Sequence, residues 1–270
     1  MQLALIGGLV VGMTAPLIGT FLVQKRLSLL GDGLGHVAFA GVAAGLLAGV
    51  WPVWTALAAA VGGACGIEWL RSRGRASGDL ALAVFFYAGI AGGVVLTGLA
   101  GALNATTLTY LFGSILTVSR SDALTITVLG AAILLVIGAS WRALLAVVLD
   151  EEAARVAGLP VTGLNLALAG LAAVAIVAGM RVVGVLLTAA LMVLPVGAAQ
   201  RLASSFRGAL VLSSMIGGIS ALVGLIAARL WNLAPGGTIV LVAGAIFVGT
   251  MLVRGRPAAP LAPEAPTATS

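Results

Sequence analysis

Residues 3–23 read LALIGGLVVGMTAPLIGTFLV, a stretch of 21 residues without one charged side chain. A helix needs about 20 such residues to cross the hydrocarbon core of a membrane. No basic segment precedes the stretch and no convincing cleavage site follows it. We therefore expect a retained membrane span rather than a signal peptide.

The composition of the whole chain agrees with this first run. Hydrophobic residues make up 61% of the 270 residues and charged residues 8%, and the mean hydropathy is +1.21. A soluble domain carries roughly 25% charged residues, so lipid surrounds most of this chain. The net charge of +6 does not indicate nucleic acid, because no basic face with interleaved aromatics exists.

Further apolar runs of spanning length recur along the chain, each too long for a loop. They cover residues 34–50, 53–70, 80–100, 122–141, 163–180, 182–200, 209–230 and 238–253. A shorter run, 106–118, is expected to be re-entrant or broken. The sequence predicts an all-α integral membrane protein, a polytopic bundle of about 8–9 transmembrane helices. Residues 1–256 would form a single transmembrane domain, and 257–270, rich in Pro, Ala and Thr, a disordered tail.

Basic residues orient the predicted spans. If nine spans cross, eleven basic residues fall on one side and three on the other. The eleven are Lys25, Arg26, Arg71, Arg73, Arg75, Arg142, Arg155, Arg201, Arg207, Arg254 and Arg256; the three are Arg120, Arg181 and Arg229. Cytoplasmic loops carry the excess of Lys and Arg. The sequence therefore predicts an outside N-terminus and a cytoplasmic C-terminus, with the count uncertain by one span.

Two polar residues interrupt this apolar pattern near residue 30. Asp32 and His36, the only histidine, are four positions apart, so in a helix both project from one face. A carboxylate and an imidazole placed this way can share a divalent metal, and ionisable groups within membrane spans usually serve transport. The alternative is that Asp32 caps the helix and His36 is a satisfied core residue.

The largest polar cluster follows residue 149 and is predicted to be cytoplasmic. Acidic residues at its start suit a short amphipathic helix over 150–160, which Gly158 and Pro160 would end. It is either a solvated loop or a docking helix for a cytoplasmic partner. The candidate docking residues are Asp150, Glu151, Glu152, Ala154, Arg155, Ala157 and Gly158.

Several kinds of catalytic site are excluded by what the sequence lacks. Lys25, the only lysine, has no Gly-x-x-x-x-Gly-Lys-Ser/Thr around it, so the chain holds no P-loop. With one imidazole beside an aspartate, a Ser-His-Asp or Cys-His arrangement is not plausible. We therefore expect a transport subunit that is not an enzyme. The energy for active transport would come from another subunit or from an ion gradient.

Taken in order, five segments resemble the ABC-3 family, the membrane permeases of ABC importers for zinc and manganese. The resemblance covers about residues 3–253 and is closest to zinc importer permeases. The segments are Arg26–Asp32 with Gly35–Ala38 and Gly41; Tyr110–Gly113; Asp150–Gly158; Val183–Leu187 running on to Leu194–Ala199; and Ala234–Gly237.

This resemblance implies the ABC importer permease fold, in a multi-pass protein of the bacterial plasma membrane. It also implies a permease homodimer that docks a cytoplasmic ABC ATPase through the 150–160 coupling helix. An extracytoplasmic metal-binding protein would deliver the metal. Asp32 and His36 would be the metal ligands, and the transported ion would be Zn²⁺ or alternatively Mn²⁺. No cofactor is implied.

Two features depart from the family pattern, and rival interpretations remain. Tyr87 stands where some zinc members carry a second histidine, and Asp32 lies nearer the cytoplasm than a midplane site would. The siderophore and cobalamin permeases share the architecture. A secondary transporter would be expected to carry more intramembrane acids than Asp32 and Glu68. A membrane scaffold without a transport role would not need the Asp–His pair.

Overall fold

The computed structural model describes residues 1–73, 78–101, 105–115 and 117–253, and within them it contains helices and no strands. The helices are α1 (Gln2–Gln24), α2 (Leu30–Leu47), α3 (Pro52–Ser72), α4 (Gly78–Leu99), α5 (Ala105–Phe112), α6 (Arg120–Leu149), α7 (Glu151–Val156), α8 (Val161–Gly179), α9 (Val185–Leu202), α10 (Phe206–Trp231) and α11 (Pro235–Val253). In the described residues, 9 helices are long and apolar enough to span a membrane. The predicted all-α membrane bundle is confirmed.

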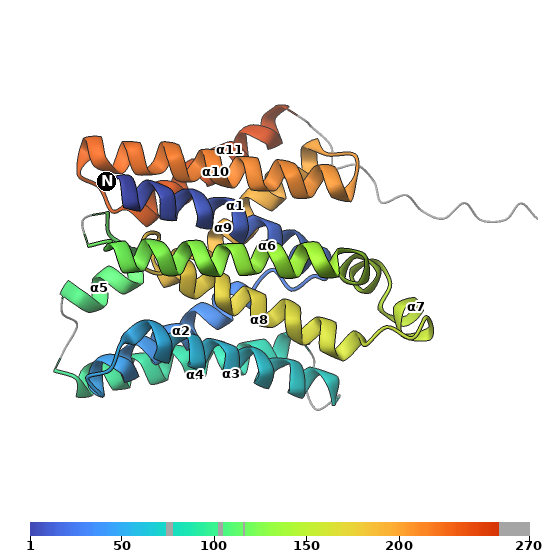
Figure 1. The fold of residues 1–270 in the computed structure, drawn as a ribbon, viewed down its shortest axis with the longest axis horizontal. Helices are drawn as coiled ribbons and strands as arrows, with labels where there is room; N and C mark the ends of the chain where they lie inside the picture. The colour runs from blue at the N-terminus through green and yellow to red at the C-terminus, as the bar shows by residue number, and fades with distance from the viewer. Residues whose placement is uncertain (74–77, 102–104, 116, 254–270) are drawn as a thin grey trace, which may run out of the picture.

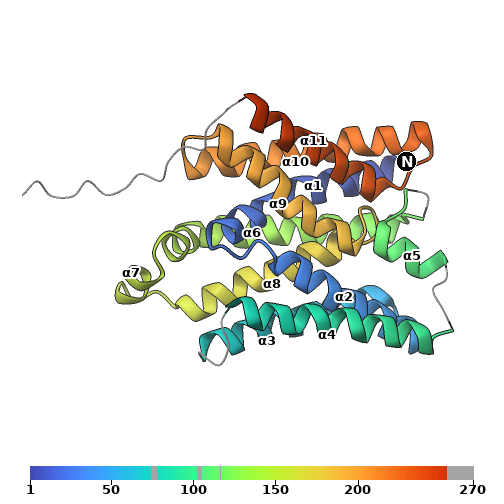
Figure 2. The same ribbon diagram turned by 180° about the vertical axis from the view of Figure 1, so that it is seen from behind.

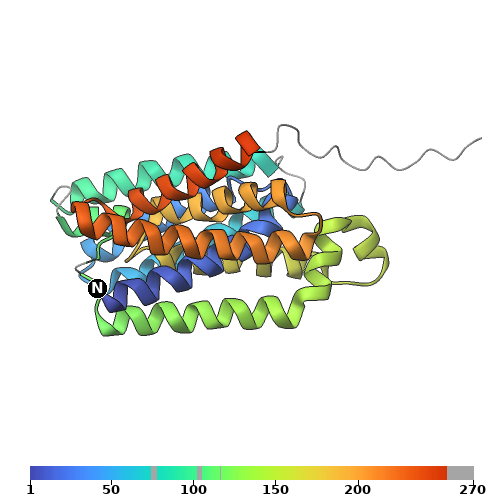
Figure 3. The ribbon, with the colours of Figure 1, turned by 90° about the horizontal axis from the view of Figure 1, so that it is seen from above.

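Successive spanning helices run in alternating directions along one axis (Figures 1 and 3). The N-terminus and α5 lie at one end of the bundle, which we call the N-terminal end. The short helix α7 lies at the opposite end, called the α7 end (Figure 1). In this arrangement the basic residues divide unequally between the two ends of the bundle, as the sequence predicts. Because the α7 end holds most of them, we place it in the cytoplasm.

The basic residues divide between the two ends as follows. The described ones at the α7 end are Lys25, Arg26, Arg71, Arg73, Arg142, Arg155, Arg201 and Arg207, against Arg120, Arg181 and Arg229 at the other. Arg75, Arg254, Arg256 and the tail 257–270 lie outside the described residues.

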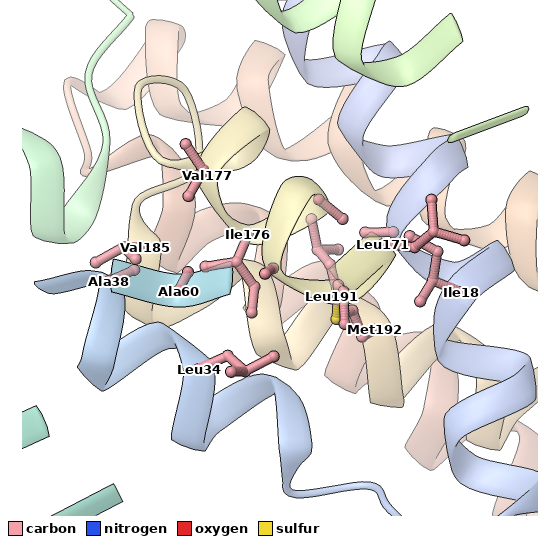
Figure 4. Packing of buried hydrophobic residues seen from close by; sticks show 14 of the residues in the cluster. Ile18, Leu34, Ala38, Ala60, Leu171, Ile176, Val177, Val185, Leu191 and Met192 are labelled. Atoms are coloured by element: carbon pink, nitrogen blue, oxygen red, sulfur yellow. The ribbon is translucent and has the colours of Figure 1, made fainter. Parts of the chain in front are cut away.

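The spanning helices pack in two groups with α8 and α9 between them. Helices α1, α10 and α11 contact one another or α9 on one side, and α2, α3 and α4 pack together on the other (Figure 2). The core lies where these groups meet α8 and α9, around Ile18, Leu34, Ile176, Leu191 and Met192 (Figure 4). Each of these five side chains is less than 2% exposed. The central position of α9 places the start of α2 against it.

Small and hydroxyl side chains let the helices approach closely, as is usual in membranes. Gly19 faces the backbone of α9 so closely that a Cβ atom there would overlap the carbonyl oxygen of Met192. Between α1 and α10, the hydroxyls of Thr20 and Ser213 share a hydrogen bond of 3.0 Å, and Ser214 Oγ donates to Met13 O at 3.0 Å. These contacts hold α1 between α9 and α10.

The short predicted run at 106–118 contains α5, whose 8 residues are too few to cross a membrane. A buried ion pair holds the neighbouring segments together at the N-terminal end. Arg181 donates to Asp122 Oδ2 at 3.1 Å and to the carbonyl oxygen of Thr117 at 3.0 Å. Its guanidinium also lies 5.0 Å from the centre of the Tyr110 ring. One arginine thus joins α5, the start of α6 and the segment between α8 and α9.

Two helix boundaries differ from the predicted ones by more than three residues. Helix α2 begins at Leu30 rather than at residue 34, because the polar Asp32 and neighbouring glycines interrupt the apolar run without interrupting the helix. Helix α6 has 30 residues and continues to Leu149, past the predicted end at residue 141. Its last turns stay helical because Leu144, Val147 and Val148 remain buried against the bundle.

Candidate metal site and coupling helix

Asp32 and His36 both lie on α2, in its first turns at the α7 end. The helix starts after Leu29, and the side chain of that residue makes no capping hydrogen bond. Asp32 is the third residue of the helix and does not occupy the N-cap position. The interpretation of Asp32 as an N-cap is therefore wrong. The helical spacing aligns the two side chains along one face, as expected.

The two side chains line an open groove of about 460 Å³ between α2 and α4. The groove is lined by Leu29, Asp32, His36, Asp79, Leu82, Ala83, Phe86 and Tyr87. The ring of His36 packs edge-on against Phe86, with centroids 4.5 Å apart. Tyr87 is 68% exposed. Ionisable side chains such as Asp32 and His36 are costly to expose to lipid on the outer face of a membrane bundle.

Asp79 lines the same groove and was missed by the sequence analysis. It lies in the first turn of α4, the helix that packs along α2. The sequence spacing between Asp32 and Asp79 does not indicate that they lie close together, because only the packing of α4 along α2 brings them to one groove. Like Asp32, Asp79 lies in the first turn of its helix, and α4 begins at the α7 end (Figure 1).

One copy of the chain offers few metal ligands. Within the described residues, no group of three or more His, Cys, Asp or Glu side chains is close enough to hold a metal ion. A structural or transported Zn²⁺ is usually held by four ligands. To bind Zn²⁺, the pair on α2 would therefore need further ligands, from water or from a second molecule facing the groove.

Glu68, the other acid considered within the spans, has a partner. Arg71 donates to both of its carboxylate oxygens, at 3.0 and 3.1 Å, from one turn further along α3. A paired acid near the end of a span is a stabilising element rather than an ion relay. Glu68 thus does not strengthen the interpretation as a secondary transporter.

A helix is present where 150–160 was predicted, but it is shorter. Asp150 caps it, its carboxylate accepting a 2.9 Å hydrogen bond from the N–H of Ala153. The helix ends at Val156, and Gly158 follows in a left-handed conformation with φ 81°. Residues other than glycine rarely adopt this conformation, which explains the glycine as a tight helix stop.

The face that α7 offers to the cytoplasm differs from the one expected. Ala154 is only 4% exposed and packs against Val147 and Val161 within the bundle. Val156, which the sequence analysis did not single out, is 91% exposed. Asp150, Glu152, Arg155, Ala157 and Gly158 are also exposed, and Glu151 is partly so. The exposed surface is therefore apolar at Val156 and Ala157 and acidic beside them.

Lys25 ties α7 to the bundle. Its ammonium donates to Glu151 Oε2 at 3.1 Å and to the side-chain oxygen of Asn165. Burial lowers the pKa of Lys25, and the hydrogen bond and charge of Glu151 offset only part of that effect. Burial alone would raise the pKa of Glu151, but the hydrogen bond and charge of Lys25 outweigh it, so the pKa of Glu151 is lowered.

Comparison with known protein families gives one match that covers almost the entire chain. The ABC 3 transport family matches residues 1–254. Two relatives that are named for the metal they transport match this chain at similar sequence identity. The manganese transport system membrane protein MntC of Listeria monocytogenes is 30% identical, over 92% of this chain and 88% of its own length. The high-affinity zinc uptake system membrane protein ZnuB of Haemophilus influenzae is 28% identical, over 94% of this chain and 97% of its own.

Solved structures show the same architecture. PsaBC from Streptococcus pneumoniae in complex with Fab has a chain that superposes with a TM-score of 0.82 at 31% identity. That match covers 93% of this chain and 90% of the other. An inward-facing metal-chelate type ABC transporter superposes with a TM-score of 0.69 at 16% identity, which shows the fold alone.

Proposed function

The chain belongs to the ABC 3 transport family. From that premise we propose that it carries Zn²⁺ across the bacterial inner membrane, as one of the two permease subunits of an ATP-driven importer. The coarser description is established: the chain is a multi-pass membrane permease of a metal ABC transporter. The proposal adds the metal, the direction and the partners. Residues 1–256 act in it as one permease domain.

The observation that carries the metal assignment is the pairing of Asp32 and His36 in the groove between α2 and α4. Two copies facing each other across this groove supply two carboxylates and two imidazoles. Four nitrogen and oxygen ligands suit tetrahedral Zn²⁺, whereas Mn²⁺ prefers an octahedral shell richer in oxygen. Manganese is the alternative cargo, supported by relatives named for manganese transport.

The homodimer accounts for the ionisable side chains in this open groove. A second copy seated on this face removes Asp32 and His36 from lipid and completes the metal ligands, which one copy does not supply from its described residues. A cytoplasmic ABC ATPase docks on the exposed residues of α7. An extracytoplasmic metal-binding protein delivers the ion at the N-terminal end. No sequence feature indicates nucleic-acid binding.

The proposal is tested in proteoliposomes that hold the permease with its ATPase and binding protein. Asp32→Ala and His36→Ala are each expected to lower ATP-dependent Zn²⁺ uptake at least 100-fold, because each removes a ligand type from both copies. Metal analysis of the wild-type dimer should find one Zn²⁺ per two chains. Glu68→Gln is the matched control, since it removes a carboxylate outside the groove, and it should retain uptake.

Three results would overturn parts of this proposal. Wild-type uptake in both alanine variants would remove Asp32 and His36 from the pathway. Stronger competition by Mn²⁺ than by Zn²⁺ would favour the manganese alternative. Uptake driven by an ion gradient in the absence of ATP would favour the rival interpretation, that the protein is a secondary transporter.

A further inference from the structure

Lys25 is buried in a way that is unusual for a lysine. It is the only lysine of the chain, and its side chain is 6% exposed. Burying an ammonium group is costly unless it is paired and hydrogen-bonded. At a membrane boundary a lysine can normally extend into water, so the inward position needs a reason beyond topology.

Three helices meet at this ammonium group. Lys25 follows the last residue of α1, Glu151 is the first residue of α7, and Asn165 lies on α8. The Asn165 amide nitrogen also lies 3.4 Å from Glu151 Oε1, as a hydrogen-bond donor. Every pair among these three side chains is thus linked, and Glu151 also lies 3.5 Å from Arg155 of its own helix. Among the ion pairs of the described residues, Lys25–Glu151 is the one that joins α7 to another helix.

A short, hydrogen-bonded segment connects Lys25 to the metal-site helix. The N–H of Arg26 donates to Val23 O at 3.0 Å, and the N–H of Leu27 donates to Leu22 O at 2.9 Å. Arg26 has a left-handed backbone with φ 59°, so the chain reverses sharply here. Helix α2 begins at Leu30, two residues before Asp32. The connection is short and bonded back onto α1, so it cannot absorb much displacement.

We infer that Lys25 is a positioning residue that couples α7 to α2, passing movement of the docked ATPase to Asp32 and His36. The inference rests on the proposed function, because it assumes that α7 receives the ATPase. When ATP binding displaces α7, Glu151 draws Lys25 with it. The tight turn at Arg26 then moves the start of α2, and with it the groove. Lys25 touches neither the metal nor the ATPase in this scheme.

Lys25→Met tests the inference, because it keeps most of the side-chain volume and removes the charge. In proteoliposomes with ATPase and binding protein, we expect ATPase association and ATP hydrolysis to persist while Zn²⁺ transported per ATP falls at least tenfold. Lys25→Arg, which retains the charge, should recover most of that ratio. Arg207→Met is the matched control: Arg207 is a cation at the same end, 5.9 Å from the centre of the Trp141 ring, and its removal should leave the ratio unchanged.

An unchanged transport ratio in Lys25→Met would overturn the inference and leave the proposed function standing. Absence of Zn²⁺ uptake in the wild-type complex would instead refute the proposed function. If the Lys25→Met protein does not insert into the membrane, Glu151→Gln removes the other charge of the same ion pair, on its more exposed side. ATPase association with this variant is then measured separately from the transport ratio. A normal ratio in that variant also overturns the inference, and a reduced one supports it.

Discussion

At the residue scale, one of the closest approaches between helices in the described residues lies at Gly19. Helices α1 and α9 cross there, and the neighbour that a new Cβ would meet is the backbone of Met192. If the neighbouring atom belonged to a side chain, it could move aside. The carbonyl oxygen of Met192 cannot, because it is part of the backbone of α9. The core residues Ile18 and Met192 pack beside the crossing (Figure 4). One added methyl group would therefore separate the two helices.

Gly19→Ala is expected to destabilise the permease by about 3 kcal/mol, the upper range for overpacking a core. For a chain of this size that corresponds to a fall of roughly 5 °C in the melting temperature of the detergent-purified protein. Gly244→Ala is the matched control. Gly244 lies on α11, where an added Cβ would meet no atom of another helix within 4 Å, so its melting temperature should stay the same or rise. Equal stability of the two variants would contradict the described crossing of α1 and α9.

The residues of the candidate site were only partly predictable. Asp32 and His36 could be found because helical spacing is a local property and the chain has one histidine. Asp79 could not, because its place beside them depends on how α4 packs along α2. Ala154 was expected on the docking face, yet it is buried. Six residues of helix give too little periodicity to show which face turns inward.

At the element scale, the spans were predictable and their ends less so. Hydrocarbon thickness sets a minimum length of apolar helix, so the number and order of long runs follow directly from the sequence. A helix end depends on hydrogen bonding and packing, which hydropathy does not register. Arg142 ends the apolar run of α6, for example, but the helix continues to Leu149.

Helix α7 gives the prediction for this scale. Val156→Glu should lower ATPase association at least tenfold, measured by co-purification, because it places a charge at the most exposed apolar position of the helix. Leu233→Glu is the matched control, an exposed apolar residue of the loop at the N-terminal end, and should leave association unchanged. Full association of the Val156 variant would show that α7 is a solvated connector.

At the scale of the whole molecule, the described chain has nine helices long and apolar enough to span a membrane, and they separate the N-terminal end of the bundle from the α7 end. Basic residues concentrate at the α7 end, and the Arg181–Asp122 ion pair, 3.1 Å long, braces the opposite end. The two ends of the bundle therefore carry different sets of charged residues. The proposed partners, one on each side, would meet chemically different surfaces.

Single cysteines at Ser72 and Asn232, introduced after replacing Cys65 by serine, test this orientation. Ser72 ends α3 at the α7 end, and Asn232 follows α10 at the N-terminal end. In intact cells an impermeant thiol reagent should label position 232, and position 72 only after the cells are opened. Labelling of both positions from outside would contradict the nine-span topology.

Helix α6 has a consequence for how α7 is held. Its 30 residues would extend about 45 Å if straight, at 1.5 Å per residue, whereas the hydrocarbon core is about 30 Å thick. The last turns of α6 bend away from the bundle axis before α7 begins (Figure 3). The surplus length therefore runs across the α7 end of the bundle instead of extending further out from it. If α7 receives the ATPase as proposed, the bend in α6 sets how far the docking surface stands from the bundle, and straightening that bend would move α7 away from the other helices.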